Sequence, residues 1–206
     1  MSKTIAIIDY GMGNLRSVQN SIDHLGGNSI IVSDPAKLSR YSKIILPGVG
    51  AFVQAISCLQ QTGLVAALNE RREAGAHILG ICLGMQLMCS ISEEDGIHHG
   101  LNWFAARVTR FRPNIALPVP HMGWNEVVFT RDDPILTGLT SGNDAYFVHS
   151  YHVRCDDMSD VLATTSYGIK FPSMIQRGNL FGIQFHPEKS QKFGLNIIWN
   201  YLEMTC

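Results

Sequence analysis

The sequence predicts a single-domain α/β fold with a central, mostly parallel sheet, helices on both faces and an antiparallel extension. Three observations support this prediction. The first half alternates short apolar runs with stretches whose apolar residues recur at helical spacing. The second half consists mainly of strand-like runs separated by turn residues. A length of 206 residues with 46% hydrophobic residues suits one compact core, so we expect residues 1–206 to form one domain.

Strands and helices alternate in the first half. The apolar run from Ile5 to Asp9 predicts a buried strand, and Asn14 begins a predicted helix that Gly26 and Gly27 end. The further expected elements are strands at Ser29 to Val32, Lys43 to Leu46 and Ala76 to Ile81 and helices at Ala51 to Gln60, Leu64 to Ala74 and Leu83 to Ser92. Buried strands separated by helices favour a parallel sheet that is covered on both faces.

The second half is expected to extend the sheet with antiparallel strands. Arg177, Gly178 and Asn179 predict a hairpin turn, and the final helix is predicted from Gln191 to Glu203. The expected strands are Val108 to Phe111, Glu126 to Phe129, Ala145 to Cys155, Val161 to Thr165, Ser173 to Gln176 and Leu180 to Phe185.

Bulk properties exclude several classes of partner. A net charge of −1 gives no electrostatic footprint for nucleic acid or for an anionic membrane, so neither is expected as a partner. No apolar run approaches the length of a membrane span, and we expect no signal peptide and a cytoplasmic protein. The five cysteines are odd in number and include no C-x-x-C pair, so we expect all of them to be reduced thiols.

Cys82 lies in a Gly-x-Cys-x-Gly sequence between a predicted strand and a predicted helix. Such a turn lifts a nucleophile clear of the sheet. It needs Gly80 and Gly84, because a Cβ at either position would clash in so sharp a bend. N–H groups at the start of the following helix favour a thiolate and an oxyanion formed beside it. Glycine-rich strand–helix turns also occur as plain structure, so this motif alone leaves both interpretations open.

A candidate base lies near the C-terminus, in the sequence Phe185-His186-Pro187-Glu188. Pro187 disfavours a helical conformation at His186, so we expect the segment to be extended. Residues two apart in an extended segment project to the same side, and Glu188 can therefore orient the His186 imidazole. The hypothesis is a thiol version of the catalytic triad, with Cys82 as nucleophile, His186 as base and Glu188 as the orienting carboxylate.

These two motifs resemble those of the class I, or triad, glutamine amidotransferases. The resemblance runs from about Ile5 to about Tyr201. Within that family the sequence is similar to the glutaminase subunits of imidazole glycerol phosphate synthases. The further stretches that carry the resemblance are Asp9 to Leu15, Leu46 to Phe52, Pro120 to Asn125 and Tyr146 to Tyr151, of which Pro120 to Asn125 is the most specific.

The resemblance implies a flavodoxin-like fold and the hydrolysis of L-glutamine to glutamate and ammonia. It places the oxyanion hole at the N–H of Leu83 and in the turn around Val49 and Gly50, with a peptide flip as one way to complete it. It places the glutamine-binding residues at Gln86, Glu94, Ser150 and Tyr151. Without the resemblance, an ordinary glycine turn, a solvated glutamine and a surface acidic pair would be the simpler interpretations.

A separate partner chain is also implied, since we expect no room for a synthase domain in 206 residues. By resemblance the partner is a (β/α)₈-barrel cyclase that forms a heterodimer with this chain. It uses ammonia to build imidazole glycerol phosphate and releases an aminoimidazole carboxamide ribotide. Trp124 is a candidate for the partner surface, because Trp anchors interfaces disproportionately. The resemblance adds Met122, Tyr146 and Lys189 to the expected interface.

No metal and no other cofactor is expected, because the histidines lack cysteines or carboxylates at ligand spacing. Three alternative functions remain open. A related type of glutaminase chain feeds ammonia to sugar-amidinating enzymes of surface polysaccharide synthesis, and Leu101 to Ala106 departs from the Gly-Trp-Ile-type segment expected for the histidine pathway. A non-catalytic binding protein is disfavoured by the intact Cys82, His186 and Glu188. A stand-alone cysteine hydrolase or peptidase would act without a partner on substrates other than glutamine.

Overall fold

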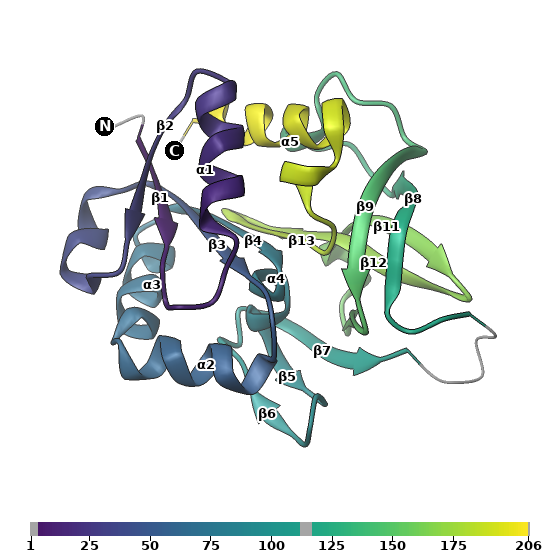
Figure 1. Ribbon diagram of the computed structural model, residues 1–206, viewed down its shortest axis with the longest axis horizontal. Helices are drawn as coiled ribbons and strands as arrows, with labels where there is room; N and C mark the ends of the chain where they lie inside the picture. The colour runs from purple at the N-terminus through teal and green to yellow at the C-terminus, as the bar shows by residue number, and fades with distance from the viewer. Residues whose placement is uncertain (1–3, 112–116, 206) are drawn as a thin grey trace.

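The computed structural model describes residues 4–111 and 117–205 and is built around a nine-stranded sheet (Figure 1). The parallel part consists, in spatial order, of β2 (Asn28–Val32), β1 (Thr4–Ile8), β3 (Lys43–Gly48), β4 (His77–Cys82) and β13 (Leu180–Ile183). The antiparallel part continues with β12 (Ile169–Arg177), β11 (Val161–Tyr167), β8 (His121–Phe129) and β9 (Asn143–His149). The predicted parallel sheet with an antiparallel extension is confirmed.

Helices cover both faces of this sheet. One face carries α1 (Leu15–His24) and α5 (Gln191–Glu203), and the other carries α2 (Phe52–Gln61) and α3 (Leu64–Glu73) (Figure 1). Along β1, Ile5 and Ile7 pack in the core with α1 and α5, whereas Ala6 and Ile8 pack in the core with α2 and α3. Successive side chains of a strand point to opposite faces, and both faces are buried here, so β1 is apolar throughout.

A second sheet, which the sequence analysis did not anticipate, has four strands. Its order is β10 (Tyr151–Cys155), β7 (Phe104–Arg110), β5 (Cys89–Ser92) and β6 (His98–His99). The predicted continuous strand from Ala145 to Cys155 is wrong, because it breaks at Ser150 into β9 and β10, which belong to different sheets. Strand-forming aromatic and β-branched residues stand on both sides of Ser150, so the sequence gives no signal for such a change of sheet.

The helix that was predicted from Leu83 to Ser92 is also wrong in its second half. Helix α4 spans only Leu83–Leu87, and the chain continues as β5, in which Cys89 pairs with Phe104 of β7. Ser, Cys and Ile are weak helix formers, so pairing with β7 outweighs continuation of the helix. The predicted hairpin turn between β12 and β13 and the predicted bounds of α5 are confirmed.

Short 3₁₀ helices complete the fold at η1 (Pro35–Arg40), η3 (Pro134–Leu136), η4 (Met158–Asp160) and η5 (Pro187–Lys189). Cys58, Cys82, Cys89 and Cys155 are free thiols, whereas Cys206 lies outside the described residues. Among the residues that the structure describes, no helix is long and apolar enough to cross a membrane.

Candidate active site

Cys82 occupies a strained turn at the end of β4. Its φ of 54° and ψ of −109° lie in a region that L-residues rarely adopt, and α4 begins at the next residue. A Cβ added to Gly84 would lie 1.8 Å from the Leu46 carbonyl oxygen, and one added to Gly80 would lie 2.7 Å from main-chain atoms of Gly84. The predicted need for glycine on both sides of the cysteine is therefore confirmed.

His186 and Glu188 meet at the C-terminal end of β13. The Nδ1 atom of His186 lies 2.8 Å from Oε1 of Glu188, and both side chains are buried. His186 is extended, with φ −95° and ψ 98°, as the following proline requires. The expectation that the whole segment is extended is wrong, because Pro187 to Lys189 form η5, where proline fits the first turn.

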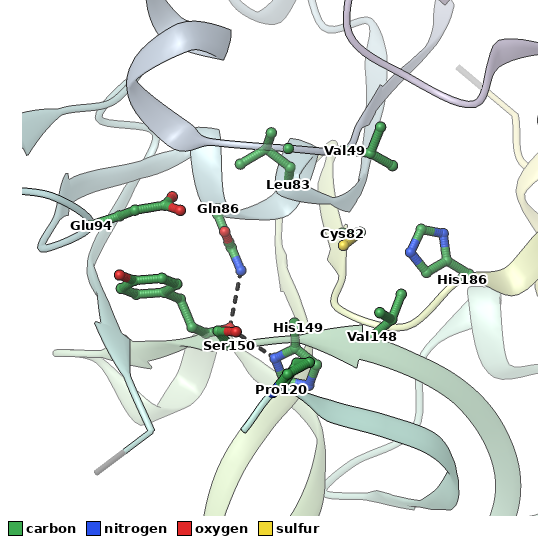
Figure 2. Close-up of a pocket in the computed structure, with 12 residues that line it drawn as sticks. Val49, Cys82, Leu83, Gln86, Glu94, Pro120, Val148, His149, Ser150 and His186 are labelled. Atoms are coloured by element: carbon green, nitrogen blue, oxygen red, sulfur yellow. Dashed lines mark hydrogen bonds between the residues drawn. The ribbon is translucent and has the colours of Figure 1, made fainter. Parts of the chain in front are cut away.

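The His186 ring faces Cys82 across the site (Figure 2). Burial by itself lowers the pKa of His186, but interactions with Cys82 and Glu188 outweigh it and raise the pKa to about 10. Among the described residues, the Nε2 atom of His186 has no hydrogen-bond partner. The ring therefore favours its imidazolium form, with one N–H held by Glu188 and the other available on the side of Cys82.

Cys82 and His186 open onto a pocket of about 370 Å³ (Figure 2). This volume lies within the range of small-molecule sites. The sequence-predicted residues in its lining are Val49, Gly50, Cys82, Leu83, Gln86, Glu94, Ser150, Tyr151 and His186. The lining residues that the sequence analysis did not assign to the site are Pro120, Val148 and His149. Glu188 lies behind His186, so the structure gathers all the predicted triad, oxyanion and substrate residues in one place.

The Gln86 side chain is held at the pocket by two hydrogen bonds within the protein. Its Nε2 atom donates to the Tyr151 carbonyl oxygen and to Oε1 of Gln184, each at 3.1 Å. Gln184 in turn donates from Nε2 to the Cys82 sulfur at 3.8 Å. The sequence analysis missed Gln184, although it is a polar residue in an apolar strand and stands two positions before His186.

The Val49–Gly50 turn is held at both ends. The Tyr10 hydroxyl donates to the Pro47 carbonyl oxygen at 2.9 Å, just before the turn. The Phe52 N–H donates to Oε2 of Glu94 at 2.8 Å, just after it. Glu94 follows β5, and its carboxylate therefore ties the start of α2 to the end of β5. Between these two anchors, Gly50 has a φ of +99°.

The residues of the expected partner interface form one continuous surface. Met122 and Trp124 of β8 are 62% and 47% exposed, which is unusual for large apolar side chains. Trp124 pairs in register with Tyr146 of β9, and their ring centroids lie 6.0 Å apart. The Lys189 ammonium lies 5.8 Å from the Tyr146 ring centroid. This surface adjoins the pocket, because the His186 N–H donates to the Tyr146 carbonyl oxygen.

A family model described as glutamine amidotransferase class-I matches residues 6–202, nearly the whole chain. The chain belongs to the class I glutamine amidotransferase family. It is an enzyme of that family, and the resemblance seen in its motifs is confirmed.

Several relatives of this amidotransferase are named imidazole glycerol phosphate synthase subunit HisH. The protein of that name from Moorella thermoacetica is 50% identical over 203 residues, which cover 98% of this chain and 96% of the relative. The one from Sulfurimonas denitrificans is 47% identical over 200 residues, which cover 96% of each chain. The one from Archaeoglobus fulgidus is 45% identical over 201 residues, with 98% of each chain covered.

Solved structures of more distant proteins share the fold. The structure of PurLQS from Thermotoga maritima matches with a TM-score of 0.77 at 17% identity and covers 98% of each chain. A glutamine amidotransferase from the same organism matches with a TM-score of 0.65 at 16% identity and covers 96% of this chain and 81% of that one. At this level of identity the likeness supports the α/β fold and carries no functional assignment.

Proposed function

We propose that this amidotransferase is the glutaminase subunit of an imidazole glycerol phosphate synthase and hydrolyses L-glutamine to glutamate and ammonia at Cys82. The observation that carries this proposal is the arrangement of three side chains. Cys82 stands on a strained strand–helix turn and faces His186 across the pocket. His186 is hydrogen-bonded to the buried Glu188. This is the geometry that an activated thiol nucleophile needs.

The proposed reaction has two halves. The Cys82 thiolate attacks the carboxamide carbon of glutamine, and the His186 imidazolium gives its proton to the departing nitrogen, which leaves as ammonia. A γ-glutamyl thioester remains on Cys82. The neutral His186 then takes a proton from water, which attacks the thioester, expels the thiolate and yields glutamate. Glu188 is not protonated in either half and keeps the imidazole in the productive orientation.

Both halves pass through an oxyanion, and two main-chain N–H groups are proposed to bind it. One belongs to Leu83, which directly follows the nucleophile. The other belongs to the turn around Val49 and Gly50, which lines the same pocket. Because this turn is anchored by Tyr10 before it and by Glu94 after it, a rotation of the peptide between Gly48 and Val49 can present or withdraw the donor without moving the strands.

The glutamine substrate is proposed to lie between Cys82 and Glu94. Glu94 supplies a carboxylate for the substrate ammonium group, and Ser150 and Tyr151 line the same pocket. Both hydrogens of the Gln86 amide are used within the protein, so Gln86 offers the pocket only its oxygen, which suits a substrate N–H donor.

The ammonia is proposed to pass directly to a partner chain, which is a (β/α)₈-barrel cyclase in a cytoplasmic heterodimer. Free ammonia would be protonated and diluted in water, so release inside the complex favours coupling. Met122, Trp124, Tyr146 and Lys189 are the residues proposed to face this partner. The names of the relatives favour the histidine pathway over the polysaccharide alternative. The unusual segment from Leu101 to Ala106 does not weaken the proposal of the histidine pathway. Its residues Leu101, Trp103 and Phe104 are buried in the core and therefore do not contact a partner directly.

We expect the isolated chain to hydrolyse glutamine slowly and the complex with a substrate-loaded barrel cyclase to hydrolyse it roughly 10²–10³-fold faster, which is the rate that one oxyanion donor supplies. The measurement is the rate of glutamate formation by the chain alone, with the cyclase, and with the cyclase plus its phosphorylated substrate. An isolated chain that is already as fast as the loaded complex would contradict the proposed switch. A loaded complex that forms no glutamate would contradict the proposed function.

A further inference from the structure

Gln184 lies against the reacting sulfur. Its side chain is fully buried at the C-terminal end of β13, and Nε2 donates to the Cys82 sulfur at 3.8 Å. The backbone around it is fixed, because the Gln184 N–H donates to the Ser173 carbonyl oxygen at 2.9 Å. A buried amide held at this position can affect the charge state of the sulfur, and the sign of the effect depends on which end of the amide faces Cys82.

The orientation of the Gln184 amide follows from its neighbours. Gln86 bonds to the Tyr151 carbonyl oxygen, which can only accept, so Gln86 must present its NH₂ group there. The second hydrogen of that NH₂ group meets Oε1 of Gln184. The NH₂ group of Gln184 is therefore directed at Cys82. A reversed Gln184 amide would set two NH₂ groups against each other and an oxygen against the sulfur.

A second series of hydrogen bonds, which runs through two histidines, also ends at the Tyr151 carbonyl oxygen. Nδ1 of His149 lies 2.8 Å from this oxygen, and Nε2 of His149 lies 2.9 Å from Nδ1 of His121. A dashed line from His149 in Figure 2 marks the first of these hydrogen bonds. The Asn125 amide donates to Nε2 of His121 at 3.2 Å, while its oxygen accepts from the Glu126 N–H. Each ring therefore accepts at Nε2 and donates at Nδ1.

Both rings are neutral, as this order requires. Burial lowers the pKa of His121 to about 4. Burial also lowers the pKa of His149 to about 3, which outweighs the opposing effect of the bond to Tyr151, and neighbouring histidines add smaller lowering contributions. The donor and the acceptor of each hydrogen bond between Asn125 and Cys82 are thus assigned. The two series of hydrogen bonds meet at the Tyr151 carbonyl oxygen, whose two lone pairs are both occupied.

We propose that Gln184 is a further catalytic group of the glutaminase site, whose side-chain N–H stabilises the Cys82 thiolate, and that Gln86 and the Tyr151 carbonyl hold its amide in the donating orientation. The inference rests on the proposed function for the use made of this thiolate. A thiolate accepts a hydrogen bond more strongly than a thiol, so the donor favours the charged form. The same contact stabilises the sulfur when it leaves from the γ-glutamyl thioester.

Titratable groups face Cys82 from several elements, and each affects the equilibrium between the Cys82 thiol and its thiolate. His186 approaches from the end of β13 with Glu188 behind it, and Tyr10 approaches from the loop after β1, where burial and the charge of Cys82 raise the pKa of its hydroxyl. His149 of β9 and Glu94 after β5 line the same pocket. A variant that tests Gln184 must therefore leave these five groups unchanged.

Gln184→Met removes the donor and keeps a side chain of similar length and no charge. We expect the pH profile of Cys82 alkylation by iodoacetamide in the free chain to move upward by about one pH unit, which lowers the rate about tenfold at pH values below the midpoint. The measurement is the labelling rate of the Cys82 peptide by mass spectrometry across pH. Gln60→Met, at an exposed position of α2, is the matched control and leaves the profile unchanged. A Gln184→Met profile that coincides with that of the unaltered chain overturns the proposal.

A second measurement needs no variant and decides the matter if Gln184→Met does not fold. The NMR resonances of the Gln184 side-chain NH₂ group in the unaltered chain are expected to shift with the same pH midpoint as Cys82 alkylation. Resonances that do not change with pH overturn the proposal. Neither measurement uses glutamine. If the loaded complex hydrolyses glutamine but both tests fail, only the role of Gln184 is refuted. If both tests succeed but the loaded complex does not hydrolyse glutamine, only the proposed function is refuted.

Discussion

Replacing Cys82 with serine is expected to abolish glutamine-dependent synthesis by the complex and to leave ammonia-dependent synthesis intact. Serine keeps the shape of the turn, but its hydroxyl is a far weaker nucleophile beside His186 than a thiolate. Loss of a triad nucleophile costs on the order of 10⁴–10⁶ in turnover. Added ammonia bypasses this site, because only ammonia generation needs the thiol.

The comparison requires both activities in one preparation of the complex, measured once with glutamine and once with an ammonium salt. Cys58→Ser is the matched control, since Cys58 is a free, partly buried thiol of α2 that does not line the pocket. Equal loss of both activities in Cys82→Ser would contradict the division of labour between two sites.

Replacing Gly50 with alanine is expected to lower glutaminase turnover of the loaded complex by roughly 10²–10³-fold with little effect on glutamine binding, because it displaces one oxyanion donor. At the φ of +99°, alanine is strained, and its Cβ would lie 2.9 Å from the terminal methyl of Met12. The turn must move to relieve the backbone strain and the close contact with Met12. The N–H groups of Val49 and Gly50 then move with it. The check is a comparison of kcat and KM for glutamine in the loaded complex.

Gly75→Ala is a matched control for the backbone strain alone. Gly75 has a φ of +83°, and a Cβ built there meets no atom within 4 Å. It stands between α3 and β4, outside the pocket lining. We expect Gly75→Ala to lower stability by about 1–2 kcal/mol and to leave turnover unchanged. Turnover that falls equally in both variants would mean that the loss reflects general destabilisation and not the oxyanion turn.

The sequence predicted the parallel half of the sheet well, because its strands are buried on both faces and read as continuous apolar runs. The elbow at Cys82 was also predictable, since its glycines are required by contacts as short as the 1.8 Å that a Cβ on Gly84 would make with Leu46. The contact between His186 and Glu188 was anticipated, although the backbone that produces it is a 3₁₀ turn.

The second sheet could not be read from the sequence. Strand β5 has only four residues and pairs with β7 across a long separation in the chain, so its conformation is set by its partner and not by local preference. The same limit hid the role of Gln184. Its two side-chain partners, Cys82 and Gln86, belong to β4 and α4, and only the fold brings them together.

The central claim is that Cys82 is the thiol that carries the γ-glutamyl group. Its most direct test is covalent trapping with a glutamine-analogue chloroketone, followed by peptide mapping of Cys58, Cys82, Cys89 and Cys155. Cys82 is expected to be labelled first, with excess glutamine slowing the reaction, because it combines a position in the pocket with a neighbouring base. Prior labelling of Cys58 or Cys155, or labelling of Cys82 that glutamine does not slow, would contradict the account.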